Sequence, residues 1–163
     1  RRLIVARALI NDPEIIILDE PTTGLDPQAR HLIWERIRQL QREDKTIILT
    51  THYMDEAEQL CDRLVIMERG KVLVEGPPKR LVADVVGDCV MEVIEPDGDV
   101  ADRYFRNAGM KVERSADRLY VYANECKTIN QEFRHAHPDI YSTIRPATLE
   151  DVFLKLTGRG LRE

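Results

Sequence analysis

Two adjacent carboxylates follow a short apolar run near the start of the chain, and they are the first candidates for chemistry. The run Glu14–Leu18 leads directly into Asp19, Glu20 and Pro21. One carboxylate can help to hold a magnesium ion, because Mg²⁺ is bound through few carboxylates and keeps several of its waters. The other, on the opposite side of the pleat, can orient or deprotonate an attacking water. The same residues also suit a solvated turn without chemistry, and this motif alone leaves both interpretations open.

A second group of polar residues favours the chemical interpretation. Gly24 and Asp26 follow the acids, and a later run that is typical of a strand, Thr46–Thr51, ends at His52. In open parallel sheets, ligands bind beyond the carboxyl ends of the strands. Two neighbouring strands would therefore bring the acids and His52 to one edge. A histidine there can contact a transferring phosphoryl group, whereas a lone histidine at a strand end is more often an ordinary core or surface residue.

The elements that must position these side chains alternate between strands and helices. Continuous apolar runs without alternation are typical of parallel strands that are buried on both faces. Asp26 and Pro27 predict the N-cap and the first residue of a helix, and Arg69-Gly70 predicts a hairpin turn. The expected order is helix end, strand, helix, strand, short helix and hairpin, over residues 3–10, 15–18, 27–40, 46–51, 54–61 and 64–75. This order predicts a parallel α/β sheet that ends in an antiparallel edge.

The pattern changes after Gly87, which is the predicted boundary between two domains, residues 1–87 and 88–163. The second domain reads as strand, helix, strand, strand, helix and strand, which is the ferredoxin-like order. These elements are expected over residues 89–94, 100–108, 111–114, 119–122, 124–138 and 141–145. A last helix is predicted to begin after its N-cap, Thr148, and to end at Gly158.

Composition and charge narrow the class of protein. The chain has 163 residues, of which 43% are hydrophobic and 33% charged, and its net charge is −5. These values are typical of a soluble globular protein and argue against a nucleic-acid binder, which usually carries a basic face. Cys61, Cys89 and Cys126 lack the spacing of a zinc or redox motif, so reduced thiols are expected. The start at Arg1, without Met, predicts a truncated chain.

The motifs resemble those of ABC-transporter ATPases over roughly the first half of the chain. Ile15–Pro21 is similar to the Walker B motif with its catalytic glutamate, and Thr23–Asp26 is similar to the D-loop. Thr50–His52 resembles the switch-histidine segment, and Arg1–Ile10 resembles the helix that directly follows the LSGGQ signature. The resemblance implies a partial P-loop NTPase fold, with a parallel sheet and helices, and a small α+β ferredoxin-like C-terminal domain.

The resemblance also implies roles for individual residues. Asp19 would help to coordinate Mg²⁺, Glu20 would polarise the hydrolytic water, and His52 would sense or contact the γ-phosphate of ATP. Gly24 and Asp26 would belong to the nucleotide site, with Asp26 at the interface of two ATPase domains. Such dimers sandwich ATP head to tail, and hydrolysis drives a transmembrane permease subunit. No nucleic-acid partner is expected.

Departures from the family pattern limit this expectation. The chain contains no phosphate loop of the form G-x-x-x-x-G-K-[ST], no Q-loop segment and no LSGGQ signature. Such a phosphate loop supplies the amide cradle and the lysine for the phosphates. The chain alone is therefore expected to bind ATP weakly or not at all, and not to hydrolyse it.

The tail narrows the subfamily. Pro146–Phe153 resembles the tail of ATPases that export drugs, lipo-oligosaccharides, nodulation factors or polysaccharides across bacterial inner membranes. The leading hypothesis is therefore the ATP-hydrolysing motor subunit of a bacterial ABC exporter, in the cytoplasm on the inner face of the membrane. A soluble ABC ATPase that acts on DNA or ribosomes, and a non-catalytic regulatory or dimerisation module, are the alternatives.

Overall fold

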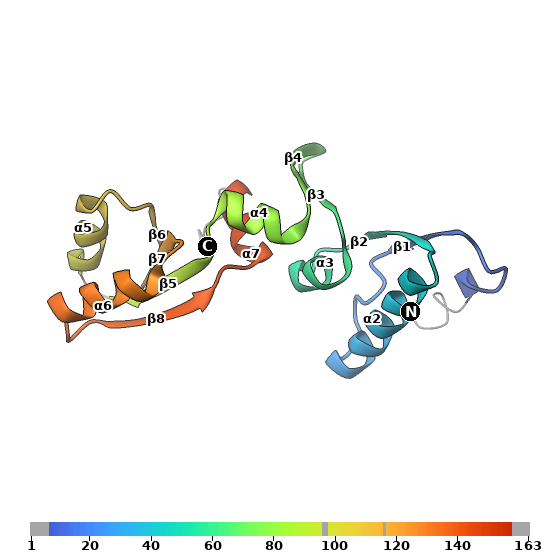
Figure 1. Cartoon of the computed structure of the whole chain (residues 1–163), viewed down its shortest axis with the longest axis horizontal. Coiled ribbons are helices and arrows are strands. Elements are labelled where there is room, and N and C mark those ends of the chain that lie inside the picture. The colour runs from blue at the N-terminus through green and yellow to red at the C-terminus, as the bar shows by residue number, and fades with distance from the viewer. Residues whose placement is uncertain (1–6, 96–97, 116, 158–163) are drawn as a thin grey trace. The chain divides into compact units, whose positions relative to one another are not determined.

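The protein is described by a computed structural model that covers residues 7–95, 98–115 and 117–157 (Figure 1). The chain divides into two units, residues 1–62 and 63–163, and each is described by itself. This division falls before Gly87, because the segment from 63 to 86 is linked to the following elements through helix packing. The domain boundary at Gly87 stays a prediction. Residues 3–6 of the helix end that is predicted over residues 3–10, and the helix stop predicted at Gly158, lie outside the described residues.

The first unit includes two parallel strands and the helices that follow them. They are β1 (Ile15–Asp19), α2 (Pro27–Arg42), β2 (Thr46–Thr50) and α3 (Met54–Leu60). The strands pair in register from Ile15 opposite Thr46 to Asp19 opposite Thr50. Helix α2 begins where the sequence predicts, with Asp26 as its N-cap and Pro27 in its first turn. Its apolar stripe packs with one face of the strands in a cluster that consists of Ile16, Leu18, Ile33, Trp34, Ile37, Leu40 and Leu60.

The other face of the two strands differs from the prediction. Ile15, Ile17 and Ile48 have exposed fractions of 60%, 71% and 54%, so the expectation that both strands are buried on both faces is wrong for this chain. Alternating residues of a strand point to opposite faces, and α2 covers only the face of Ile16 and Leu18.

The second unit begins with the predicted hairpin. Strands β3 (Leu64–Glu68) and β4 (Lys71–Gly76) pair antiparallel, and the turn uses positive φ at Arg69 and Gly70. Within the described residues these strands form a two-stranded sheet of their own. The antiparallel edge that the sequence had indicated for the β1–β2 sheet is not among the strand pairs of the described residues. Helix α4 (Pro78–Val85) follows and packs against β4 and against the last helix, α7 (Leu149–Thr157).

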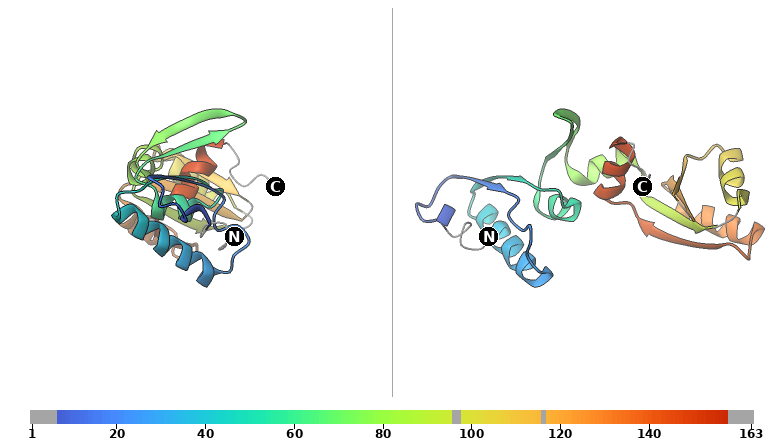
Figure 2. Two further views of the ribbon diagram at one scale, coloured as in Figure 1. Left: turned by 90° about the vertical axis from the view of Figure 1, so that its right-hand side faces the viewer. Right: turned by 180° about the vertical axis from the view of Figure 1, so that it is seen from behind.

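The rest of the second unit is a four-stranded antiparallel sheet with helices (Figures 1 and 2). Its elements are β5 (Cys89–Ile94), α5 (Val100–Asn107), β6 (Val112–Ser115), β7 (Arg118–Ala123), α6 (Cys126–Ala136), β8 (Tyr141–Pro146) and α7 (Leu149–Thr157). The strand order β6-β7-β5-β8 is that of a ferredoxin-like fold, which confirms the prediction. Helices α5 and α6 pack against the sheet around a core that includes Met91, Phe105, Leu119, Val121 and Phe133.

The cysteines also differ from the expectation. Cys89 and Cys126 form a disulfide, whereas Cys61 is free. The sheet register explains the pairing, because Cys89 lies opposite Ala123 at the end of β7 and the chain then enters α6 at Cys126. The two residues are 37 positions apart in the sequence, so no spacing motif reveals them. None of the helices in the described ranges is long and apolar enough to cross a lipid bilayer.

Candidate functional site

The carboxyl ends of β1 and β2 lie side by side, as the sequence predicts. Asp19 is the register partner of Thr50, and the Thr50 hydroxyl donates a hydrogen bond to Asp19 Oδ1. The backbone N–H of Glu20 donates to the carbonyl of Thr50 at 3.0 Å. Parallel pairing therefore delivers both acids to the edge at which the His52 segment leaves β2.

Glu20 and His52 are in direct contact at this edge. His52 Nδ1 lies 2.5 Å from Glu20 Oε2, with 57% and 33% of the two side chains exposed. The Thr23 hydroxyl donates to the same carboxylate oxygen at 2.5 Å. Glu20 has a positive φ of 50°, a conformation that is uncommon for a residue with a side chain and that often occurs at functional sites. The carboxylate is thus held by its neighbours while it remains partly open to solvent.

Asp19 offers one position for a divalent cation. Its side chain is at the exposed end of β1 and accepts the Thr50 hydroxyl. No group of three or more His, Cys, Asp and Glu side chains among the described residues is placed to hold a metal ion. Mg²⁺ does not need such a cage, because it is commonly bound by one or two carboxylates together with waters and substrate phosphates. The residues present therefore fit one carboxylate ligand for Mg²⁺.

Gly24 and Asp26 form the turn between Glu20 and helix α2. Gly24 has a φ of +78°, and no atom lies within 4 Å of the position that a Cβ would take. Its backbone conformation, rather than lack of space, requires glycine there. Asp26 is exposed and its Oδ1 accepts a hydrogen bond from Ala29 N at 2.9 Å. The structure shows that Asp26 caps α2, and its predicted role between two ATPase domains stays a prediction.

Two buried polar residues beside this edge, Thr22 and Glu56, were missed by the sequence reasoning. Glu56 Oε1 accepts hydrogen bonds from Thr22 Oγ1 at 2.8 Å and from Trp34 Nε1 at 2.9 Å. Glu56 and Thr22 are both 0% exposed. One signal was available in the sequence, because Glu56 adjoins Ala57 and lies four positions before Leu60, on the apolar side of a short helix. An acid on the buried side of a helix needs a partner.

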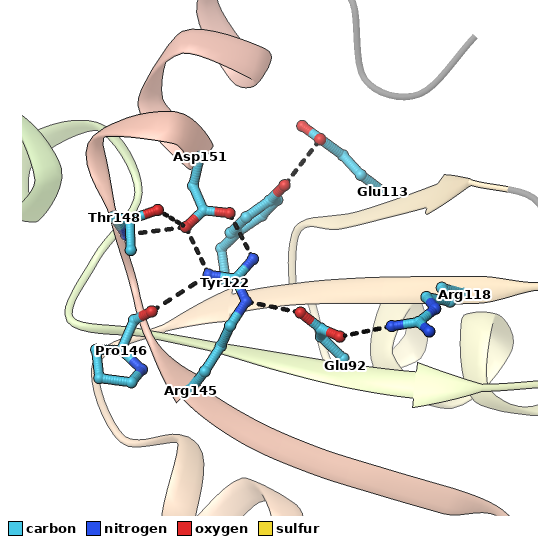
Figure 3. Close-up of polar contacts among 8 residues, drawn as sticks. All are labelled: Glu92, Glu113, Arg118, Tyr122, Arg145, Pro146, Thr148 and Asp151. Atoms are coloured by element: carbon cyan, nitrogen blue, oxygen red, sulfur yellow. Dashed lines mark hydrogen bonds and ion pairs between the residues drawn. The ribbon is translucent and has the colours of Figure 1, made fainter. Parts of the chain in front are cut away.

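A second polar cluster occupies the face of the four-stranded sheet next to α7 (Figure 3). Arg145 donates to both carboxylate oxygens of Asp151 at 2.7 Å and to Glu92 Oε1 at 2.6 Å. Glu92 also pairs with Arg118 at 3.2 Å. The Tyr122 hydroxyl donates to Glu113 at 2.9 Å, and burial, followed by that hydrogen bond, raises the pKa of Tyr122. Apart from Arg118, these groups line a cavity of about 330 Å³, and its charged groups already pair with one another.

Asp151 joins α7 to the sheet. Besides Arg145, its Oδ2 accepts the Thr148 N–H at 2.9 Å and the Thr148 hydroxyl at 3.0 Å, as in a capping interaction at the start of a helix. Burial acts to raise the pKa of Asp151, but the hydrogen bonds from Arg145 and Thr148 outweigh burial and hold this pKa below its ordinary value. The contacts of this cluster therefore attach α7 to the sheet, and they account for its charged groups without a ligand.

Comparison with known proteins gives matches in both halves of the chain. Residues 98–158 match the family model described as nodulation factor export protein NodI, C-terminal domain. Residues 2–54 match a model described as AAA domain, putative AbiEii toxin, Type IV TA system. Among solved structures, cbiO1 from Clostridium perfringens, part of the ABC transporter complex cbiONQ, is 38% identical with a TM-score of 0.46. That alignment covers 51% of this chain and 34% of cbiO1.

Relatives along the whole chain decide the family. Nod factor export ATP-binding protein I of Ralstonia nicotianae is 47% identical, and the protein of the same name from Neorhizobium galegae is 48% identical. Both alignments cover 100% of this chain. The chain belongs to the ABC-transporter ATP-binding proteins. It spans 52% and 47% of these two relatives, which is about half their length. The match to the NodI C-terminal domain confirms that the tail of this chain resembles that of exporter ATPases.

Proposed function

We propose that this chain is part of the ATP-hydrolysing motor subunit of a bacterial ABC exporter of the drug, lipo-oligosaccharide or polysaccharide type. The observation that carries the proposal is the contact between Glu20 and His52 beyond the ends of two parallel strands, next to Asp19. Similarity along the whole of this chain to about half the length of Nod factor export ATP-binding proteins supports the exporter class. ATP would be the substrate, and a permease subunit in the membrane and a second copy of the ATPase domain would be partners.

Each side chain at the strand ends would have a separate role in ATP hydrolysis. Glu20 would accept the proton of a water, or orient that water, for in-line attack on the γ-phosphate, and a general base contributes roughly 10²- to 10⁴-fold to the rate. His52 would contact the γ-phosphate and stabilise its developing charge. Asp19 would supply one carboxylate ligand to Mg²⁺. The bound Mg²⁺ would neutralise negative charge on the phosphate oxygens.

This chain would supply only one side of the nucleotide site of the complete ATPase. The chain contains the Asp19, Glu20 and His52 side of a nucleotide site but no phosphate-loop sequence, so other residues must hold the phosphates. Gly24 and Asp26 lie in the turn that would face the second ATPase domain. The complete subunit would act in the cytoplasm, on the inner face of the membrane.

The test is Mg²⁺-dependent ATP hydrolysis by the full gene product that contains this chain. Glu20→Gln is expected to lower kcat by roughly 10²- to 10⁴-fold, because the amide cannot accept the proton of the water. Glu35→Gln, an exposed change on α2, is the matched control and should leave kcat unchanged. Full activity of the Glu20→Gln protein would contradict the proposed chemistry.

A further inference from the structure

Glu56 is a fully buried carboxyl group to which the proposed hydrolysis assigns no role. It lies on α3 with an exposed fraction of 0%. Its Oε1 accepts both hydrogen bonds, from Thr22 and from Trp34, and within the described ranges Oε2 has no hydrogen-bond partner. A buried carboxyl group is unfavourable unless hydrogen bonds compensate for its lost hydration. The side chain is therefore anchored through one oxygen and two donors.

The two donors come from separate segments, so Glu56 joins three parts of the unit. Thr22 belongs to the turn that follows Glu20. Trp34 belongs to α2, and Glu56 belongs to α3, which begins at Met54 directly after the His52 segment. One oxygen atom thus connects the segment of the proposed base, the helix that follows Asp26 and the segment of the proposed phosphate contact.

Short backbone links extend this connection to the reacting side chains. On one side, Thr23 N donates to the Glu20 carbonyl at 3.3 Å, and the Thr23 hydroxyl reaches the Glu20 carboxylate. On the other side, Ala57 N donates to the Tyr53 carbonyl at 3.2 Å, and the rings of Tyr53 and His52 have centroids 4.1 Å apart. Glu56 is therefore connected to both Glu20 and His52 through a short series of contacts. A substitution at Glu56 can displace either side chain.

We propose that Glu56 is a positioning residue that fixes the Glu20 carboxylate relative to His52 through its hydrogen bond with Thr22. The proposal rests on the proposed function, because the pair matters for rate only if it acts on ATP. Small displacements of reacting groups can cost about 100-fold in rate. The hydrogen bond from Trp34 is expected to contribute to stability and not to the rate, because it does not hold the turn.

The two donors to one oxygen give a matched comparison in the full gene product. Thr22→Val removes the bond to the turn and keeps the shape of the side chain, whereas Trp34→Phe removes the bond to α2. Thr22→Val and Glu56→Leu are expected to lower kcat roughly 10- to 100-fold with a nearly constant KM for ATP. Trp34→Phe and Glu56→Gln, which keeps an acceptor oxygen, should stay within about threefold of the wild type.

Stability is measured on the same variants, because unpaired buried polar groups cost about 1–3 kcal/mol. Glu56→Leu leaves both donors without their acceptor, whereas Thr22→Val and Trp34→Phe each remove one of the two donors to Glu56 Oε1. A merely structural role predicts that kcat follows stability, so that Trp34→Phe and Thr22→Val lose activity alike. Equal losses in these two variants, or full activity of Glu56→Leu, would overturn the proposal.

A second measurement does not depend on hydrolysis. The imidazole NMR signals of His52 in residues 1–163 report its contact with Glu20, and a His52→Gln spectrum assigns them. Thr22→Val and Glu56→Leu are expected to shift these signals, while Trp34→Phe leaves them in place. An unmoved His52 signal in the first two variants would also overturn the proposal. If the wild-type gene product did not hydrolyse ATP, the proposed function would fail, and this NMR result would still decide the role of Glu56.

Discussion

Glu20 combines an uncommon backbone conformation with a central position in the candidate site. Its φ of 50° lies in the left-handed region, which costs a residue with a side chain about 1 kcal/mol or more. The backbone bond to Thr50 and the contacts with Thr23 and His52 keep the residue there. Such local strain is tolerated where several contacts determine one geometry, which is consistent with a side chain that must meet a reacting water.

Asp26 has a structural role that can be separated from its predicted interface role. Asp26→Ala removes the acceptor for Ala29 N and should lower the free energy of unfolding of the first unit by about 1 kcal/mol. Asp26→Asn keeps the cap and removes the charge, so stability should remain near that of the wild type. Urea unfolding followed by the fluorescence of Trp34, the chain's only tryptophan, measures this. An Asp26→Ala protein as stable as the wild type would exclude the capping contribution.

The sequence predicted the site only in part, and the reason is visible at single residues. Asp19, Glu20 and His52 were predicted because each follows an apolar run that reads as a strand, and parallel strands end at one edge. Thr22 and Glu56 were not predicted, since their hydrogen bond joins residues 34 positions apart and depends on how α3 packs. A local sequence pattern does not predict a contact between residues so far apart in the chain.

Helices and hairpins were predicted well where the residues at their ends favour a cap or a turn. Helix α2 begins at Asp26-Pro27 and the hairpin turns at Arg69-Gly70 as expected, because capping and turn geometry depend on the residues themselves. The burial of β1 was predicted less well, since exposed Ile15 and Ile17 depend on which element covers each face. The Cys89–Cys126 pair needed the register of β5 with β7, which only the assembled sheet provides.

The attachment of α7 to the sheet is expected to depend on pH. The pKa of Asp151 is lower in the folded chain than its ordinary value of 3.8. Its stabilising contribution is therefore complete above about pH 3.8 and is lost as the pH falls through the lower folded value. Asp151→Asn should lower the free energy of unfolding by about 2–4 kcal/mol at pH 7, because Arg145 loses its bidentate partner.

Calorimetric unfolding at pH 7 and pH 3 tests this prediction. The difference between wild type and Asp151→Asn should shrink at the lower pH, because Asp151 of the unfolded chain, with its ordinary pKa of 3.8, is then mostly protonated. The exposed neighbour Glu150 provides the control, and Glu150→Gln should change little at either pH. A difference that is the same at both pH values would show that Asp151 acts by shape and not by charge.

The disulfide is a second attachment within the C-terminal sheet and helices. It closes a loop between residues 37 positions apart, and such a cross-link stabilises a fold by roughly 2–4 kcal/mol. Reduction, or Cys126→Ser, should lower the unfolding temperature of the second unit, while Cys61→Ser leaves it unchanged. Thiol titration of the unfolded chain should count one thiol before reduction and three after it, as the three cysteines require. Three thiols without reductant would show that the bond does not form.

At the scale of the whole molecule, the chain divides into two units with separate hydrophobic cores. The first carries the proposed reacting side chains, and the second has its own core around Phe105 and Phe133. The matched relatives are about twice as long as this chain. Ile15, Ile17 and Ile48 are exposed on one face of the two strands that carry the site. The proposed hydrolysis is therefore tested on the full gene product, to which this chain would contribute Asp19, Glu20 and His52.

Residues 1–163 alone should bind ATP too weakly to work as an ATPase. Asp19, Glu20 and His52 include no group that can enclose the phosphates, whereas a phosphate loop surrounds them with backbone N–H groups and a lysine. We expect no saturable binding of Mg²⁺–ATP by calorimetry below about 1 mM, which corresponds to a binding free energy of about −4 kcal/mol. Hydrolysis should not exceed that of the Glu20→Gln chain. Turnover that depends on Glu20 in the isolated chain would show that these residues, without a phosphate loop, are sufficient to position the γ-phosphate.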